Sequence, residues 1–250
     1  MNARTKRSLR KYLKGYRTLM DGHRGASAPG FEGFFRRLAR DLPRLQESRR
    51  RKALFRAPDF NIFRVLPIER REVFLHSPML AHLLDPTASH GQGYLFLGAF
   101  FQVAHKNARL SPPAEPLDPS QWSVRPEVYI GNGSIDLLIE CPTQGYVLVV
   151  ENKIDAAEHP TQLSRYYRWL QERQSDYPNP QLVFLTPTGR ASDSKQKIPY
   201  VRMSYHRDIR EIVNQTVDQI RAPRVQELMN QYRAILNDWA QEETDESSTR

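Results

Sequence analysis

The sequence predicts a mixed α/β domain that follows a basic helical segment. Apolar patterns typical of helices and strands alternate after the first quarter of the chain, and 39% of the 250 residues are apolar, which is enough for a packed core. Residues 1–56 carry 17 Lys and Arg against 4 Asp and Glu, whereas the remainder is close to neutral. We therefore expect a basic helical N-terminal segment at 1–56, a folded domain at 57–240 and a disordered polar tail at 241–250.

Five helices are expected before the first strand, at residues 12–20, 31–45, 67–76, 77–84 and 94–103. The second has apolar residues at helical spacing, and the fifth is strongly apolar. Pro67 and Pro78 both suit the first turn of a helix, and Ser77 is placed to cap the helix that Pro78 begins. A proline-rich loop at 111–120 then separates these helices from the strands.

Strands and helices alternate in the second half of the chain. Strands are expected at 134–140, 146–153, 181–186 and 200–205, from runs rich in Val, Ile, Leu and aromatic residues. Helices are expected at 159–174, 208–220 and 223–240, the first of them with a stripe of Leu and Tyr. This order indicates an α/β fold.

The side chains that could bind a metal or catalyse a reaction gather in the hairpin formed by the first two expected strands. A four-residue loop at 142–145 would place Cys141 opposite Tyr146, and the same register places Asp136 opposite Glu151. Lys153 shares the face of Glu151, because side chains alternate along a strand. A loop one residue longer would move Asp136 to the other face, so the convergence depends on the register.

Two carboxylates side by side in an apolar sheet repel each other unless a positive charge lies between them. A divalent cation such as Mg²⁺ suits this place, since it binds one or two carboxylates and keeps sites for water or phosphate. With Lys153 nearby, such a centre suits in-line hydrolysis of a phosphodiester. The alternative is a salt bridge between Lys153 and the two acids, which the apolar run at 147–150 makes less favourable.

An apolar strand with an Asp, followed by an apolar strand that ends in Glu-x-Lys, resembles the PD-(D/E)XK nuclease superfamily. Glu-Asn-Lys at 151–153 and Gln-Leu at 162–163 resemble an uncharacterised bacterial branch of it, as do His-Ser at 76–77 and Leu-Thr-Pro at 185–187. The resemblance spans roughly residues 58–205. It implies a three-layer restriction-endonuclease-like core with a mixed central sheet flanked by helices.

The resemblance also assigns roles to residues. It makes Asp136 and Glu151 the metal carboxylates for Mg²⁺ or Mn²⁺, and Lys153 the catalytic lysine. The main-chain carbonyl of Asn152 would be a further ligand, and Gln162 would support the site. An additional acid from an early helix corresponds to Glu72.

The pattern leaves three points open. Glu69 lies one turn from Glu72 and is an alternative for the early acid. Glu127 is a second uncertain acid, because it precedes the strand of Asp136. Ile135 stands where the family has proline, a tolerable departure because that proline is not a ligand.

The leading interpretation is a Mg²⁺-dependent nuclease, most simply a DNA endonuclease, for which relatives suggest a role in defence or restriction. The basic segment would hold phosphates without reading sequence. We expect nucleic acid to contact the run of basic residues in this segment and an arginine three residues after Gln162. These residues are Arg49, Arg50, Arg51, Lys52 and Arg165. Two alternatives are a catalytically silent nucleic-acid-binding protein with the nuclease fold, and a scaffold whose basic segment binds an acidic partner or a membrane surface.

Other site classes find little support in the sequence. Cys141 is the one cysteine, which excludes an intrachain disulfide and a cysteine-based zinc cluster. The spacing of His76, His82 and His90 does not favour a metal cluster, and they are interpreted as capping, core or loop residues. No segment is apolar enough to span a membrane and no secretory signal is evident, so we expect a cytoplasmic protein. A homodimer is an option by analogy with enzymes that cut both strands.

Overall fold

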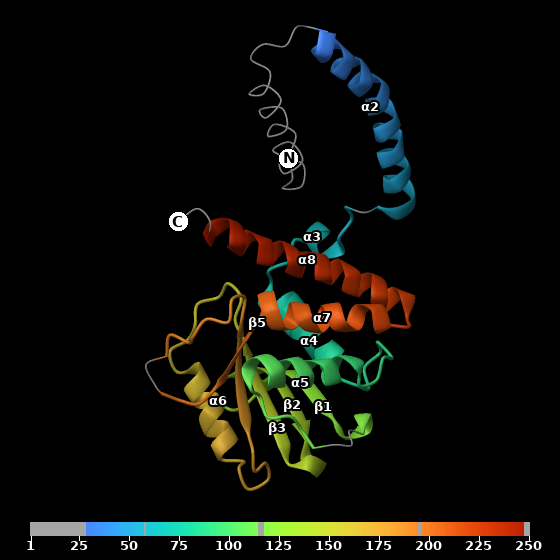
Figure 1. The fold of residues 1–250 in the computed structure, drawn as a ribbon. Coiled ribbons are helices and arrows are strands. Elements are labelled where there is room, and N and C mark those ends of the chain that lie inside the picture. Colours follow the sequence, from blue (N-terminus) through green and yellow to red (C-terminus); the bar gives the residue numbers. More distant parts are fainter. Residues whose placement is uncertain (1–28, 58, 115–117, 195–196, 248–250) are drawn as a thin grey trace. The chain divides into compact units, whose positions relative to one another are not determined.

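The computed structural model describes residues 29–57, 59–114, 118–194 and 197–247. The chain divides into two units, Met1–Phe60 and Asn61–Arg250, close to the expected boundary after residue 56. In the first unit, helix α2 (Pro29–Arg56) contains the helix expected at 31–45 and extends it (Figure 1). The four basic residues at 49–52 are exposed on α2. The helix expected at 12–20 lies outside the described residues.

A five-stranded sheet forms the centre of the second unit, in the order β1-β2-β3-β4-β5. The strands are β1 (Ser123–Tyr129), β2 (Ser134–Cys141), β3 (Tyr146–Asn152), β4 (Gln181–Thr186) and β5 (Val201–Ser204). The pairs β1–β2 and β2–β3 are antiparallel, whereas β3–β4 and β4–β5 are parallel. The mixed sheet confirms the expected architecture. Strand β1 is absent from the sequence prediction, because its exposed charges and its proline weaken the strand pattern.

Helices cover both faces of the sheet (Figure 1). Helix α6 (Gln162–Gln171) lies on one face, and α4 (Ser77–Leu84), α5 (Leu95–Ala108) and α7 (Arg210–Thr216) lie on the other. Helix α8 (Pro223–Ser247) packs against α7 and extends into the tail for which disorder is expected from residue 241. No helix in the described part of the chain is long and apolar enough to cross a membrane.

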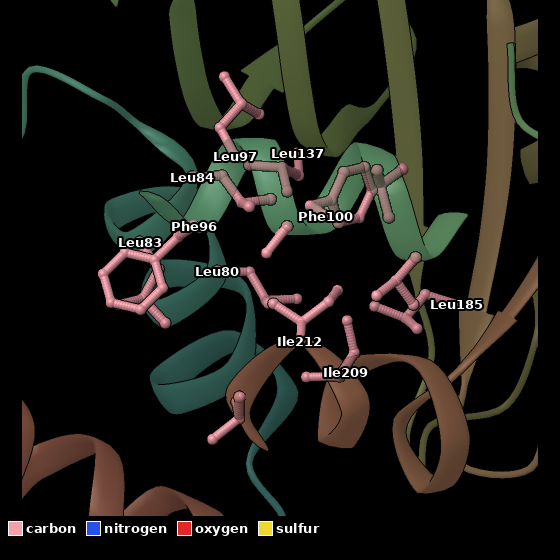
Figure 2. Packing of buried hydrophobic residues seen from close by; sticks show 14 of the residues in the cluster. Leu80, Leu83, Leu84, Phe96, Leu97, Phe100, Leu137, Leu185, Ile209 and Ile212 are labelled. Atoms are coloured by element: carbon pink, nitrogen blue, oxygen red, sulfur yellow. The ribbon is translucent and has the colours of Figure 1, made fainter. Parts of the chain in front are cut away.

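Two hydrophobic clusters hold these layers together. The larger cluster joins α4, α5, α7 and α8 to one face of the sheet, and Figure 2 shows Leu80, Leu97, Phe100 and Ile212 converging from three helices. The smaller cluster joins α6 to the other face. Each side chain of this kind contributes roughly 1.5–3 kcal/mol when it is fully buried, so the sheet is fixed from both sides.

The segment before α4 differs from the prediction in two respects. The prediction of a helix at 67–76 is wrong over its first half, where the chain forms turns. One of these turns is closed by a hydrogen bond from Ile68 N–H to the Phe63 carbonyl. After the short helix α3 (Ile62–Val65) and these turns, a π-helical turn, η1 (Glu72–His76), leads directly into α4. Ser77 therefore does not cap a helix, because the chain before it is already helical. Its hydroxyl instead accepts a hydrogen bond from Asn152.

Candidate active site

The hairpin of β2 and β3 has the register that the sequence predicts. Cys141 pairs with Tyr146 and Leu137 pairs with Val150, so Asp136 and Glu151 face each other at the next step. The loop between the strands ends at Gly145, which has a left-handed φ of 58°. A Cβ atom there would also lie 2.9 Å from the ring of Pro178, so glycine is needed for both reasons.

Asp136 is held in place by the backbone of the neighbouring strand. Its Oδ2 accepts a hydrogen bond of 2.7 Å from the main-chain N–H of Asn152, just beyond the last backbone pair of the two strands. Burial raises the pKa of Asp136 above its ordinary value, although this hydrogen bond opposes the shift. The carboxylate is thus fixed beside Glu151.

Glu151 is a fully buried acid whose charge is poorly compensated. Both of its carboxylate oxygens are buried and have no hydrogen-bond partner among the described residues. Burial raises the pKa of Glu151, and the negative charge of Asp136 raises it further. Buried polar atoms without partners are rare in folded proteins, so this pair of oxygens indicates a place for a cation.

Lys153 lies between two acids, one residue beyond the end of β3. Its Nζ is 3.3 Å from Oε1 of Glu151, an ion-pair distance without hydrogen-bond geometry, and 3.2 Å from Oε1 of Glu72. Burial lowers the pKa of Lys153, but the charges of Glu151, Glu72 and Asp136 outweigh burial and raise it. The lysine is therefore a positive charge at neutral pH rather than a proton acceptor.

Glu72 reaches this cluster from η1, and Glu69 does not. The second Glu72 oxygen accepts a hydrogen bond of 2.8 Å from the N–H of Ile154, so both oxygens have partners. The carboxylate of Glu69 instead pairs with Arg64. Glu127, the other uncertain acid, is exposed on β1 and has a left-handed φ of 50°. The resemblance makes Glu72 a metal ligand, but the partners of both its oxygens favour a role in positioning Lys153.

The sequence as a whole agrees with this geometry. A family model for the PD-(D/E)XK nuclease superfamily matches residues 60–235. The chain belongs to this superfamily. A comparison with curated proteins and one with solved structures give no significant match. The matched range contains the whole sheet together with Glu72 and Gln162.

The superfamily signature, an Asp followed by Glu-x-Lys, corresponds here to Asp136, Glu151 and Lys153, which the structure brings together. The intervening Asn152 points its side chain to the opposite face of the sheet. There it donates to the Ser77 hydroxyl at 2.9 Å and accepts from the Tyr205 hydroxyl at 2.8 Å. These bonds fix the end of β3, and with it the direction of the residues on either side.

Gln162 contacts Tyr166, one helical turn further along α6. Its side-chain amide donates to the Tyr166 hydroxyl at 3.0 Å, and that hydroxyl donates to the Ser134 carbonyl on β2. Burial, and then the charge of Glu151, raise the pKa of Tyr166 above its ordinary value. Tyr166 is part of the core, but the sequence analysis did not reveal that its hydroxyl links Gln162 to β2. A tyrosine one turn after Gln162 is the signal that could have shown it.

Arg165 and the histidines lie outside the cluster of acids. Arg165 donates to the Asn132 carbonyl at 2.5 Å and so holds the turn between β1 and β2; a contact with nucleic acid remains a prediction. His76 is buried against Tyr205, Tyr232 and Trp239. In the described part of the chain, no group of three or more His, Cys, Asp or Glu side chains could hold a metal ion.

The residues present fit a hard cation bound through few protein ligands. The two oxygens of Glu151 lack hydrogen-bond partners in the described chain, and Asp136 lies opposite. A Mg²⁺ site often uses only one or two carboxylates, with water and substrate phosphate completing it. Asp136 and Glu151 would hold the ion, and the Asn152 carbonyl is the predicted third ligand.

Proposed function

We propose that the protein is a Mg²⁺- or Mn²⁺-dependent nuclease that hydrolyses phosphodiester bonds in DNA, most simply as an endonuclease. The observation that carries the proposal is the buried Glu151 carboxylate without hydrogen-bond partners among the described residues, between Asp136 and the charged Lys153. Membership of the superfamily supports a nuclease, and superfamily members generally use these two ions. A role in defence or restriction is an expectation from relatives.

Each side chain has a role that follows from its surroundings. A divalent cation, when bound, would stabilise negative charge on the phosphate and lower the pKa of a water molecule. Asp136 and Glu151 hold the cation, and the Asn152 N–H keeps Asp136 oriented. Lys153 remains protonated and donates to a phosphate oxygen as charge builds up on it in the transition state.

Glu72 and Tyr166 position the residues that touch the substrate. Glu72 keeps the Lys153 ammonium group beside Glu151, and its bond to Ile154 N–H fixes its own carboxylate. Tyr166, oriented by Gln162, ties α6 to the start of β2 and so maintains the distance between the helix and Asp136. Small displacements of such groups cost catalytic rate even without contact to the substrate.

Cleavage of plasmid DNA tests the proposal, with an RNA of matched length as the second substrate. We expect the wild-type protein to cut DNA with Mg²⁺ or Mn²⁺, to stop with EDTA, and to lose activity by about a hundredfold or more in Lys153→Ala and Asp136→Ala. Lys197→Ala, which alters an exposed lysine outside the cluster, should retain activity. Cleavage of RNA alone would reassign the substrate. Binding of DNA without cleavage by any form would favour a silent binding protein.

A further inference from the structure

A polar hollow lies along strand β5, away from the candidate active site. Its volume is about 270 Å³. Strand β5 is at the edge of the sheet, two places from the β3 strand that carries Glu151, which corresponds to roughly 10 Å between strand axes. The hollow shares no residue with the candidate active site and is lined by Asn107, Ala108, Arg109, Thr188, Gly189, Arg202 and Arg207.

The acidic groups close to the hollow are already neutralised. Arg207 donates to both oxygens of the buried Asp208 carboxylate, at 2.7 and 3.1 Å. Asn107 donates to Asp208 and to Glu211, and Glu211 forms an ion pair of 2.9 Å with Lys106. These pairs contribute little net charge, so the charge of the hollow depends on its other two arginines.

Arg109 and Arg202 are exposed, and within the described part of the chain their guanidinium groups form no hydrogen bond and no ion pair. The hydroxyl of Thr188 likewise has no partner there. Each guanidinium offers five N–H donors in a planar fork that matches the oxygens of a phosphate group. The hollow therefore presents two positive charges and a hydroxyl to an incoming anion.

The backbone at Arg109 adds an independent observation. This residue ends α5 with a left-handed φ of 60°, a conformation that favours glycine, and its N–H bonds to carbonyls of the last helical turn. An arginine is strained at such a position, and residues held in strained conformations cluster at functional sites. The strain places a guanidinium group at the rim of the hollow.

We propose that this hollow binds a backbone phosphate of the nucleic-acid strand, away from the bond that is cut. The inference rests on the proposed nuclease function, because the same strand would have to reach Asp136 and Lys153. A phosphodiester matches the paired arginine forks in charge and geometry. Such a contact fixes the position of the strand without reading its sequence.

Binding of a short fluorescein-labelled DNA duplex, measured in EDTA so that the duplex stays intact, tests the proposal. Arg109→Gly and Arg202→Gln should each weaken binding about fivefold or more. Each should also reduce, by about one, the magnitude of the slope of log affinity against log salt concentration. Arg224→Gln, which removes the same charge from an exposed position on α8, should stay within about twofold of the wild type. Arg109→Gly also relieves the backbone strain, so its Tm should not fall, and weaker binding could not be ascribed to unfolding.

The outcomes separate this inference from the proposed function. If the wild type binds and cuts DNA while both hollow variants bind as Arg224→Gln does, the hollow inference is overturned and the nuclease stands. If no form binds DNA, both fail. If inorganic phosphate raises the Tm of the wild type but not of the hollow variants, and DNA affinity is unaffected, the hollow is a site for free phosphate and the strand assignment is wrong.

Discussion

Glu72 Oε1 lies 3.2 Å from the Lys153 ammonium group, although 81 positions separate the two residues in the chain. The contact joins a π-helical turn to the end of β3, and both side chains are largely buried, with exposed fractions of 12% and 10%. Lys153 is thereby held beside Glu151, which lies 3.3 Å away on the other side. The sequence suggested Glu72 only as a metal ligand, by resemblance. In the structure its observed partner is Lys153.

Glu72→Gln is expected to lower kcat about tenfold or more while leaving metal binding intact. Glutamine can still accept a hydrogen bond from Ile154 N–H, but it no longer pairs with the charge of Lys153. The measurement is kcat for DNA cleavage beside the affinity for Mn²⁺. Glu227→Gln, an exposed change on α8, is the control. A marked loss of Mn²⁺ affinity in Glu72→Gln would show instead that Glu72 is a metal ligand.

Glu151→Gln is expected to raise the Tm in the absence of divalent metal. The folded protein raises the pKa of Glu151 to about 9, so folding at neutral or higher pH must either take up a proton or bury a charge, whereas glutamine requires neither. The gain should shrink as the pH falls through the raised pKa toward the ordinary value of 4.5, because the folded wild type then takes up a proton. Thermal unfolding in EDTA at several pH values measures it. A lower Tm at pH 8 would mean instead that the ion pair with Lys153 outweighs the cost of burying this carboxylate.

Much of the candidate site could be predicted from the sequence, because it depends on local rules. Loop length and alternation fix the register of a hairpin, and both place Asp136 opposite Glu151 correctly. The strand at Gln181–Thr186 is also correct, since a buried parallel strand is a short apolar run. What failed depends on long-range contacts or on exceptions to local rules. Strand β1 contains Pro126, the π-helical turn replaces a regular helix, and no spacing rule predicts the pair of Glu72 and Lys153.

His76 should make the protein less stable as the pH falls below about 6.5. Burial lowers its pKa from 6.5 to about 4, so between these values the unfolded chain binds a proton that the folded protein does not. A shift of that size corresponds to about 3 kcal/mol in the free energy of unfolding, lost progressively down to pH 4. Glu151 contributes its own pH dependence to both proteins, so the measurement is the difference in the free energy of unfolding between the wild type and His76→Gln, which should fall by that amount over this range. The same change at His159, which is exposed, should leave the pH dependence of the wild type in place.

The basic residues of α2 should contribute affinity rather than catalysis. Changing the four exposed residues at 49–52 to glutamine is expected to weaken DNA binding. The slope of log affinity against log salt concentration should become shallower by about 0.9 for each phosphate that these side chains neutralise in the wild type. The value of kcat at saturating DNA should stay near that of the wild type. Fluorescence anisotropy over a range of salt concentrations measures the change. An unchanged salt slope would mean that this run does not bind phosphates.

Direct binding of Mn²⁺ in the absence of nucleic acid tests the central claim, that Asp136 and Glu151 together form a cation site. Electron paramagnetic resonance counts free Mn²⁺, and the wild type is expected to bind one ion with an affinity that Asp136→Asn and Glu151→Gln each reduce at least about tenfold. Glu227→Gln should bind as the wild type does. Equal binding by all four proteins would contradict the account, because the ion would then not depend on the two carboxylates that face each other across the hairpin.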